Sequence, residues 1–94
     1  MPEPQADADS AWGLFTVYVD AREKTMAALK EKGVPTSIYY PIPLHKHRAF
    51  APHAPQGGLP VCERMAERVM SLPFHPYMTD EQVERVAAAL KAAI

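Results

Sequence analysis

Proline constrains the fold of this chain more than any other residue type. Eight of the ten prolines among its 94 residues lie between Pro35 and Pro76. Each proline lacks a backbone N–H donor and has a fixed φ, so it interrupts a helix interior or a central strand. Because four prolines lie between residues 41 and 55, we predict that residues 41–58 form neither structure. A loop of this length in a small domain is usually functional or poorly ordered.

The residues before this loop predict a strand, a helix and a second strand. Residues 14–19 alternate between two faces, as in a strand that is buried on one side. Asp20 and Glu23 have the spacing of a capping box, which predicts a helix that ends near Gly33. The β-branched and aromatic run from Thr36 to Tyr40 then predicts another strand.

The residues after the loop predict two further helices, with a short extended segment at Ser71 and Leu72 between them. Pro60 suits the first turn of a helix that we expect to reach Met70. Its predicted apolar stripe consists of Val61, Cys62, Met65, Ala66 and Val69, and we interpret Cys62 as buried and inert. Thr79 and Gln82 have capping-box spacing and begin the last predicted helix. Together these elements predict an α+β fold, in which helices pack on a small two- or three-stranded sheet.

Length and charge balance exclude several classes of protein. A chain of 94 residues forms one domain, with an expected disordered lead-in at residues 1–11 and a folded part at residues 12–94. The net charge is −1 and no run of one sign occurs, so we expect neither nucleic acid nor a membrane as a partner. A single cysteine excludes an internal disulfide framework and favours a cytoplasmic location.

The candidate binding residues lie where the predicted second strand meets the proline-rich loop. Tyr39 and Tyr40 end this strand, two prolines hold the next residues extended, and His45 follows. Two phenols and an imidazole on a rigid segment can line a ligand pocket. The same pattern fits two packing tyrosines that alternate between core and solvent, followed by a histidine that caps a turn. The residues by themselves leave both interpretations open.

A metal site is the main alternative chemistry. His45, His47, His53, Cys62 and His75 carry the imidazole and thiolate groups that zinc prefers. Their spacing matches no compact zinc motif, so we expect no metal site and interpret His75 as a turn residue.

Four charged residues lie on the helix predicted from Pro60. We interpret Glu63, Arg64, Glu67 and Arg68 as a solvated face, on which Arg64 and Glu67 are spaced to pair. The chain contains no nucleophile motif of the G-x-S-x-G kind.

Four segments of the chain resemble one known family. They are GVPTSIYYPIPLH at residues 33–45, AF at residues 49–50, GGLPV at residues 57–61 and ERVMSLPFHPYMTDEQVERV at residues 67–86. In order and spacing they are similar to the C-terminal portion of the DegT/DnrJ/EryC1/StrS aminotransferases, from about Trp12 to Ile94. Each segment alone is a weak signal, but the four in register form a specific one.

The resemblance implies a fold and a chemistry. It implies the small C-terminal domain of a fold-type I aminotransferase, which closes over a larger domain that holds pyridoxal phosphate on a lysine. These enzymes transfer an amino group, commonly from glutamate, to a keto nucleotide-sugar in polysaccharide or secondary-metabolite biosynthesis. The residues before the Tyr-Pro step reach the substrate in this family, which implies substrate binding by Tyr39 and Tyr40, with His45 nearby. A histidine is common where Tyr39 stands, so the chain departs from the family pattern there.

The cofactor chemistry that the resemblance implies needs groups outside this chain. A lysine that carries pyridoxal phosphate needs a phosphate-binding turn and an acidic partner for the pyridine nitrogen. The lysines at positions 24, 30, 32 and 91 lie on solvent-facing sides of predicted helices, and Lys46 lies on the proline-rich loop. We therefore expect no catalytic lysine, no bound cofactor and no aminotransferase activity in this chain alone.

Two hypotheses follow for the role of the chain. The first is a domain of a sugar aminotransferase, with a large cofactor-binding domain or a second subunit as its partner and a nucleotide-sugar as substrate. The second is a free-standing interaction module that kept the fold without the catalysis. Apolar side chains outside the predicted core, such as Trp12, Phe74 and Tyr77, lead us to expect a homodimer.

Overall fold

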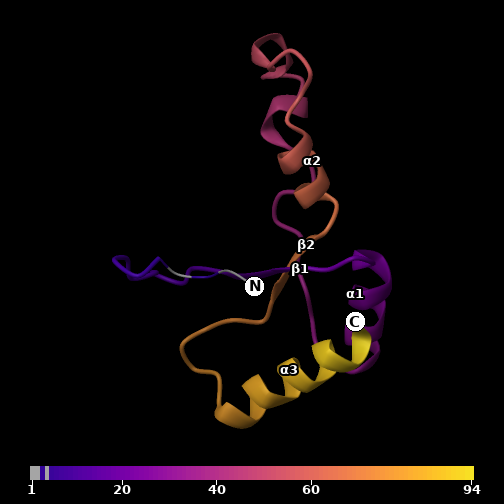
Figure 1. The fold of residues 1–94 in the computed structure, drawn as a ribbon. Coiled ribbons are helices and arrows are strands. Elements are labelled where there is room, and N and C mark those ends of the chain that lie inside the picture. The colour runs from indigo at the N-terminus through magenta and orange to yellow at the C-terminus, as the bar shows by residue number, and fades with distance from the viewer. Residues whose placement is uncertain (1–2, 4) are drawn as a thin grey trace.

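Two short strands lie at the centre of the molecule (Figure 1). In this view helix α2 lies above them, and helices α1 and α3 lie to the right of and below them. The computed structural model describes residue 3 and residues 5–94. The predicted lead-in at residues 1–11 lies partly outside the described residues, and its disorder stays a prediction. In chain order the elements are β1 (Phe15–Tyr18), α1 (Arg22–Glu31), the 3₁₀ turns η1 (Leu44–Lys46) and η2 (Ala51–His53), α2 (Pro60–Ala66), β2 (Val69–Leu72) and α3 (Asp80–Ala93).

The sheet consists of β1 and β2, which pair in antiparallel orientation. The register places Val17 opposite Met70 on the buried face. Thr16 and Ser71 are opposite each other on the other face, where their hydroxyls hydrogen-bond at 2.8 Å. The alternation predicted for residues 14–19 and the α+β fold with a small sheet are confirmed.

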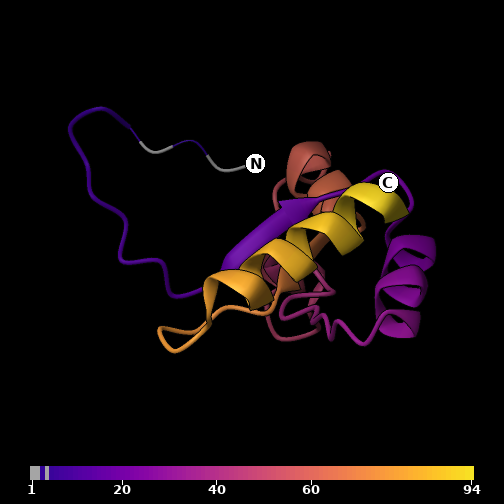
Figure 2. The ribbon, with the colours of Figure 1, turned by 90° about the horizontal axis from the view of Figure 1, so that it is seen from below.

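The hydrophobic core lies between the sheet and helices α1 and α3. Figure 2 shows α3 lying along the sheet, with α1 at its far end. Because both helices contribute side chains to the same cluster, residues far apart in the sequence share one core. Its buried members are Val17, Val19, Leu29, Val34, Met70 and Ala89.

Helix α1 ends as its sequence predicts, but it begins differently. Gly33 has φ 72°, the Gly33 N–H donates to Lys30 O, and the Val34 N–H donates to Leu29 O. These are the two bonds of a Schellman motif, and Val34 and Leu29 also meet in the core.

The capping box predicted for Asp20 and Glu23 is wrong. Ala21 is the N-cap residue, and no side chain caps it. The Asp20 carboxylate instead lies 2.9 Å from the Arg68 guanidinium. An ion pair with a distant part of the chain therefore replaces the local cap. Arg22 ties the same region together, since its Nη1 donates to Ala66 O at 2.6 Å.

The strand predicted for Thr36 to Tyr40 is also wrong. Ser37 and Ser71 form an isolated bridge, with two backbone hydrogen bonds of 2.8 and 3.1 Å. Pro35 and Pro41 flank this segment and have no N–H to donate. Pro35, two residues before Ser37, stops the ladder on that side, because a proline has no N–H to donate. The pairing stays at one bridge and the sheet has two strands.

Residues 41–66, which we call the arm, project away from the core (Figure 1). The absence of regular structure predicted for residues 41–58 is confirmed, apart from the turns η1 and η2. Helix α2 ends at Ala66 rather than Met70, because β2 begins at Val69. The predicted apolar stripe is largely wrong: Ala66 is buried, but Val61 and Cys62 are exposed, since α2 lies on the arm and not on the sheet.

Helix α3 begins with the predicted capping box. The Gln82 N–H donates to Thr79 Oγ1, and the Thr79 N–H donates to Gln82 Oε1 at 2.9 Å. Val86 and Leu90 pack against the core, whereas Val83 remains half-exposed. In the described part of the chain no helix has the length and apolar character of a membrane span.

Candidate functional site

Tyr39 and Tyr40 lie beside the sheet, just after the Ser37 bridge. They help to line a small cavity of about 90 Å³, together with side chains of β1 and β2 such as Thr16 and Ser71. Their exposed fractions are 56% for Tyr39 and 79% for Tyr40. Neither tyrosine is a core residue, so the interpretation of one as a buried packing residue is wrong. Both phenols are open to a ligand.

His45 lies apart from this cavity, on turn η1 of the arm. Its side chain is only 10% exposed, and its Nε2 lies 2.9 Å from the Glu63 carboxylate. The structure therefore brings Tyr39 and Tyr40 together at one cavity but does not bring His45 into its lining. A carboxylate only accepts hydrogen bonds, so Nε2 carries the proton in this contact.

Glu63 is a functional-site candidate that the sequence interpretation missed. Its Oε2 lies 2.6 Å from Lys46 Nζ, and its Oε1 accepts from the Leu59 N–H at 3.1 Å. The hydrogen bonds from Lys46, His45 and Leu59 all favour the ionised carboxylate, and they lower the pKa of Glu63 from 4.5 to about 2. The interpretation of Glu63 as part of a solvated face is therefore wrong, because η1 packs against that face.

Arg68 also leaves the predicted solvated face. Besides its ion pair with Asp20, it donates to the Tyr18 hydroxyl at 3.3 Å and lies 5.3 Å from the Tyr18 ring centroid. This arginine supports the end of β1 rather than a ligand site. The pair proposed between Arg64 and Glu67 is not among the ion pairs of the described residues.

The histidines and the cysteine have separate roles. His47 contacts Ile42 O at 3.2 Å, and His75 Nδ1 accepts from the Tyr77 N–H, as expected for a turn residue. Cys62, predicted to be buried, is exposed. Within residue 3 and residues 5–94, no three His, Cys, Asp or Glu side chains gather as metal ligands do.

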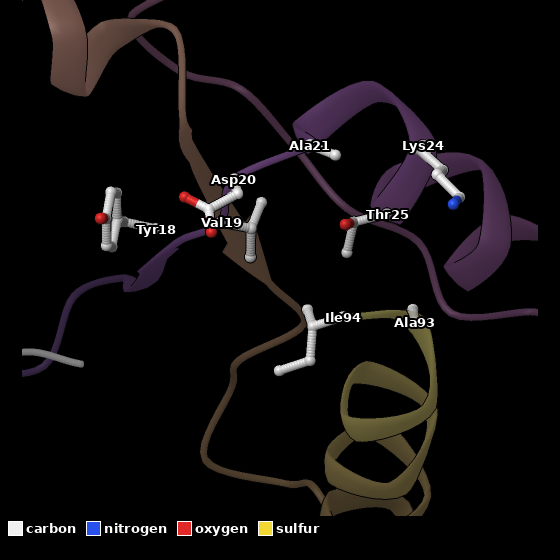
Figure 3. A pocket seen from close by; sticks show the side chains of 8 residues that line it. All are labelled: Tyr18, Val19, Asp20, Ala21, Lys24, Thr25, Ala93 and Ile94. Atoms are coloured by element: carbon white, nitrogen blue, oxygen red, sulfur yellow. The ribbon is translucent and has the colours of Figure 1, made fainter.

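A larger cavity of about 290 Å³ lies beside the start of α1 and the end of α3 (Figure 3). It contains Lys24 and Asp20, the kinds of residue that a pyridoxal phosphate site needs. Figure 3 shows these two side chains well apart, on opposite sides of Thr25. Asp20 is already paired with Arg68, and Lys46 is paired with Glu63. Neither Lys24 nor Lys46 is therefore placed with Asp20 as a lysine and an acid around pyridoxal phosphate would be.

The chain is similar in sequence to nucleotide-sugar aminotransferases. The profile of the DegT/DnrJ/EryC1/StrS aminotransferase family matches residues 1–91. The chain is 38% identical over 94 residues to UDP-N-acetyl-3-dehydro-alpha-D-glucosamine 3-aminotransferase of Acidithiobacillus ferrooxidans, covering 100% of this chain and 25% of that protein. It is 44% identical over 81 residues to UDP-2-acetamido-2-deoxy-3-oxo-D-glucuronate aminotransferase of Pseudomonas aeruginosa, covering 86% and 22%.

The fold leads to the same group of proteins. A DegT DnrJ EryC1 StrS aminotransferase from Brucella abortus superposes with a TM-score of 0.87 at 34% identity, covering 97% of this chain and 25% of that one. The chain thus spans about a quarter of the length of the relatives that it matches, and the match is to their C-terminal part.

Proposed function

The chain belongs to the DegT/DnrJ/EryC1/StrS aminotransferase family. From this premise we propose that it is the C-terminal portion of a pyridoxal-phosphate-dependent sugar aminotransferase. The enzyme transfers an amino group, with glutamate as donor, to a keto nucleotide-sugar in polysaccharide or secondary-metabolite biosynthesis. The observation that carries the proposal is the agreement of sequence and fold with such enzymes over 97% of this chain. Both relatives named above act on nucleotide-sugars, according to their names.

In this proposal the chain contributes substrate contacts and not the cofactor. Tyr39 and Tyr40 present two exposed phenols at a cavity on the open face of the sheet. A phenol both donates and accepts hydrogen bonds, which suits the hydroxyls and phosphates of a nucleotide-sugar. His45 belongs to the neighbouring arm and contacts the substrate only if the arm closes over it. The lysine that binds pyridoxal phosphate lies in the large domain, and no cofactor is expected on this chain alone.

The same proposal names partners and a location. The large cofactor-binding domain is the first partner, and a second copy of this chain is the next. An apolar cavity of about 330 Å³ between β2 and α3, lined among others by Phe74, Val83 and Leu90, is open to such a partner. We place the enzyme in the cytoplasm, and neither nucleic acid nor a membrane is a partner.

A chimera tests the proposed function. Residues 12–94 replace the matching C-terminal segment of the Acidithiobacillus ferrooxidans relative, whose remaining chain supplies the cofactor site. We expect the chimera to form the amino product from its keto nucleotide-sugar and glutamate. A folded chimera that binds pyridoxal phosphate but shows no turnover would contradict the proposal.

Variants of the chimera test the two tyrosines. Tyr39→Phe or Tyr40→Phe removes one hydroxyl, so we expect KM for the nucleotide-sugar to rise about two- to tenfold, the effect of one hydrogen bond, with kcat less affected. Tyr77→Phe is the matched control, because Tyr77 is exposed and lies outside the cavity. Equal KM values for all three variants would show that the hydroxyls of Tyr39 and Tyr40 do not bind the nucleotide-sugar.

A further inference from the structure

One carboxylate joins the two halves of the arm. Glu63 is in the middle of α2, whereas His45 and Lys46 are on η1. His45 Nε2 lies 2.9 Å from Glu63 Oε1, and Lys46 Nζ lies 2.6 Å from Glu63 Oε2. Each oxygen thus binds one side chain of the loop. Among the described residues, these two contacts are the ion pairs that connect residues 41–58 to α2.

The same carboxylate also closes the end of the loop. Leu59 is the N-cap residue of α2 and has no side-chain oxygen to cap the helix. Glu63 reaches back to the Leu59 N–H at 3.1 Å and so satisfies a donor that the helix leaves unpaired. Gly58 lies against the same carboxylate, since a Cβ at Gly58 would be 2.7 Å from Glu63 Oε1. The loop therefore packs against Glu63 at both of its ends.

We propose that Glu63 is a positioning residue, whose carboxylate holds residues 41–58 and the His45 ring in place on helix α2. Few apolar contacts are available for this task, because Ile42, Leu44 and Val61 are exposed. Hydrogen bonds to a charged group are stronger than neutral ones, and three donors converge here. The importance of these Glu63 contacts, which we call the anchor, for substrate binding rests on the function proposed above. The contacts themselves do not depend on that function.

The charge of Glu63 gives the anchor a defined pH dependence. Because the folded pKa is lowered from 4.5 to about 2, the stabilisation is fully present above pH 4.5. It is lost as the pH falls toward 2, since protonation leaves the cations of His45 and Lys46 without their counter-charge. These two residues and the Leu59 amide are the groups that face Glu63 in the described residues.

Amide hydrogen exchange of the chain tests this proposal without any activity assay. Glu63→Gln keeps the size of the side chain and removes its charge. We expect the amides of Lys46, His47 and Phe50, which bond within the loop, to exchange about tenfold faster or more, since a bond to a charged group is lost. The α3 amides report the fold and should keep their protection. Glu67→Gln is the matched control, because Glu67 is an exposed glutamate at the C-cap of α2 and makes none of the described ion pairs.

Three further measurements separate positioning from a simple effect on α2. Lys46→Gln should add little to Glu63→Gln in the double variant, because both changes break the same contact. Glu63→Asp should recover part of the protection, since it keeps the charge. Loop protection in the unmodified chain should fall between pH 4.5 and about 2, but stay flat in Glu63→Gln. Independent effects of the two substitutions, or equal exchange in Glu63→Gln and Glu67→Gln, would overturn the proposal.

Discussion

Leu29 and Met70 are the largest fully buried side chains among the residues that the structure describes. Leu29 lies on α1 and Met70 on β2, and both contribute to the core that α1, α3 and the sheet enclose. A domain of this size has one small core and a narrow margin of stability. The loss of a single such side chain therefore removes a large share of the free energy of unfolding.

We expect Leu29→Ala to lower the free energy of unfolding by about 2–5 kcal/mol, through lost burial and the cavity left behind. Leu44→Ala is the control, because Leu44 is 65% exposed whereas Leu29 is 0% exposed. Its effect should stay within about 0.5 kcal/mol, as for other surface changes. Urea denaturation followed by circular dichroism measures both. Similar losses for the two variants would show that the core has been wrongly assigned.

Single residues of the candidate site were predictable to different degrees. The position of Tyr39 and Tyr40 at one cavity follows from their adjacency in the sequence, but the strand predicted to end there is a single bridge and His45 does not line that cavity. The role of these three residues in substrate binding stays a prediction. Glu63 was missed, because its partners Lys46 and His45 belong to a turn that the sequence does not place beside α2. Local spacing indicates contacts along one helix, and a contact between segments needs the fold.

At the scale of elements, the two predicted capping boxes had opposite outcomes. Thr79 and Gln82 cap α3 because no charged group competes for them in the described contacts. Asp20 is followed by the correctly spaced Glu23 but binds Arg68 instead. A cap contributes about 1 kcal/mol, so a nearby cation is enough to redirect an aspartate.

We expect Thr79→Ala to lower the free energy of unfolding by about 1 kcal/mol, because the Gln82 N–H loses its acceptor. Thr79→Ser keeps the hydroxyl and should cost less than half as much. Thermal and urea unfolding of the two variants provides the comparison. If alanine and serine destabilise the chain equally, the capping hydroxyl does not stabilise α3.

At the scale of the whole molecule, the projecting arm and the N-terminal segment make the chain extended (Figure 1). Its radius of gyration is 15.6 Å and its extents are 47 × 36 × 20 Å, whereas a domain of about 100 residues averages about 13 Å. A shape of this kind exposes apolar side chains on both the arm and α3, among them Leu44, Val61 and Val83. Such surface is typical of a domain that packs against other protein.

We therefore expect the isolated chain to form a homodimer through the apolar cavity between β2 and α3. Val83→Asp places a charge at this cavity and should shift the chain toward monomer. Val61→Asp is the control, since Val61 is also exposed (62%, against 51% for Val83) but lies on the arm. Sedimentation at micromolar concentration measures the mass of each variant. A monomer of 10.4 kDa over a hundredfold range of dilution would contradict self-association.

The sequence by itself determined the elements that depend on local chemistry. The alternation in β1, the Schellman end of α1 at Gly33 and the capped start of α3 each involve residues within a few positions of one another. Prolines also act locally, which is why residues 41–58 were correctly predicted to lack regular helices and strands.

Only the tertiary structure decided which side chains are buried and which charges meet. The periodicity of α2 predicted a buried stripe with Cys62, but α2 lies on the arm, where no sheet covers that stripe. Ser37 pairs with Ser71, which is distant in the sequence, and Pro35 prevents the pairing from extending on its side of that bridge. Glu63 acquired its low pKa from a turn folded back onto its helix. In each case the outcome depends on the packing of distant segments, because burial and ion pairing are properties of the assembled surface and not of the spacing along the chain.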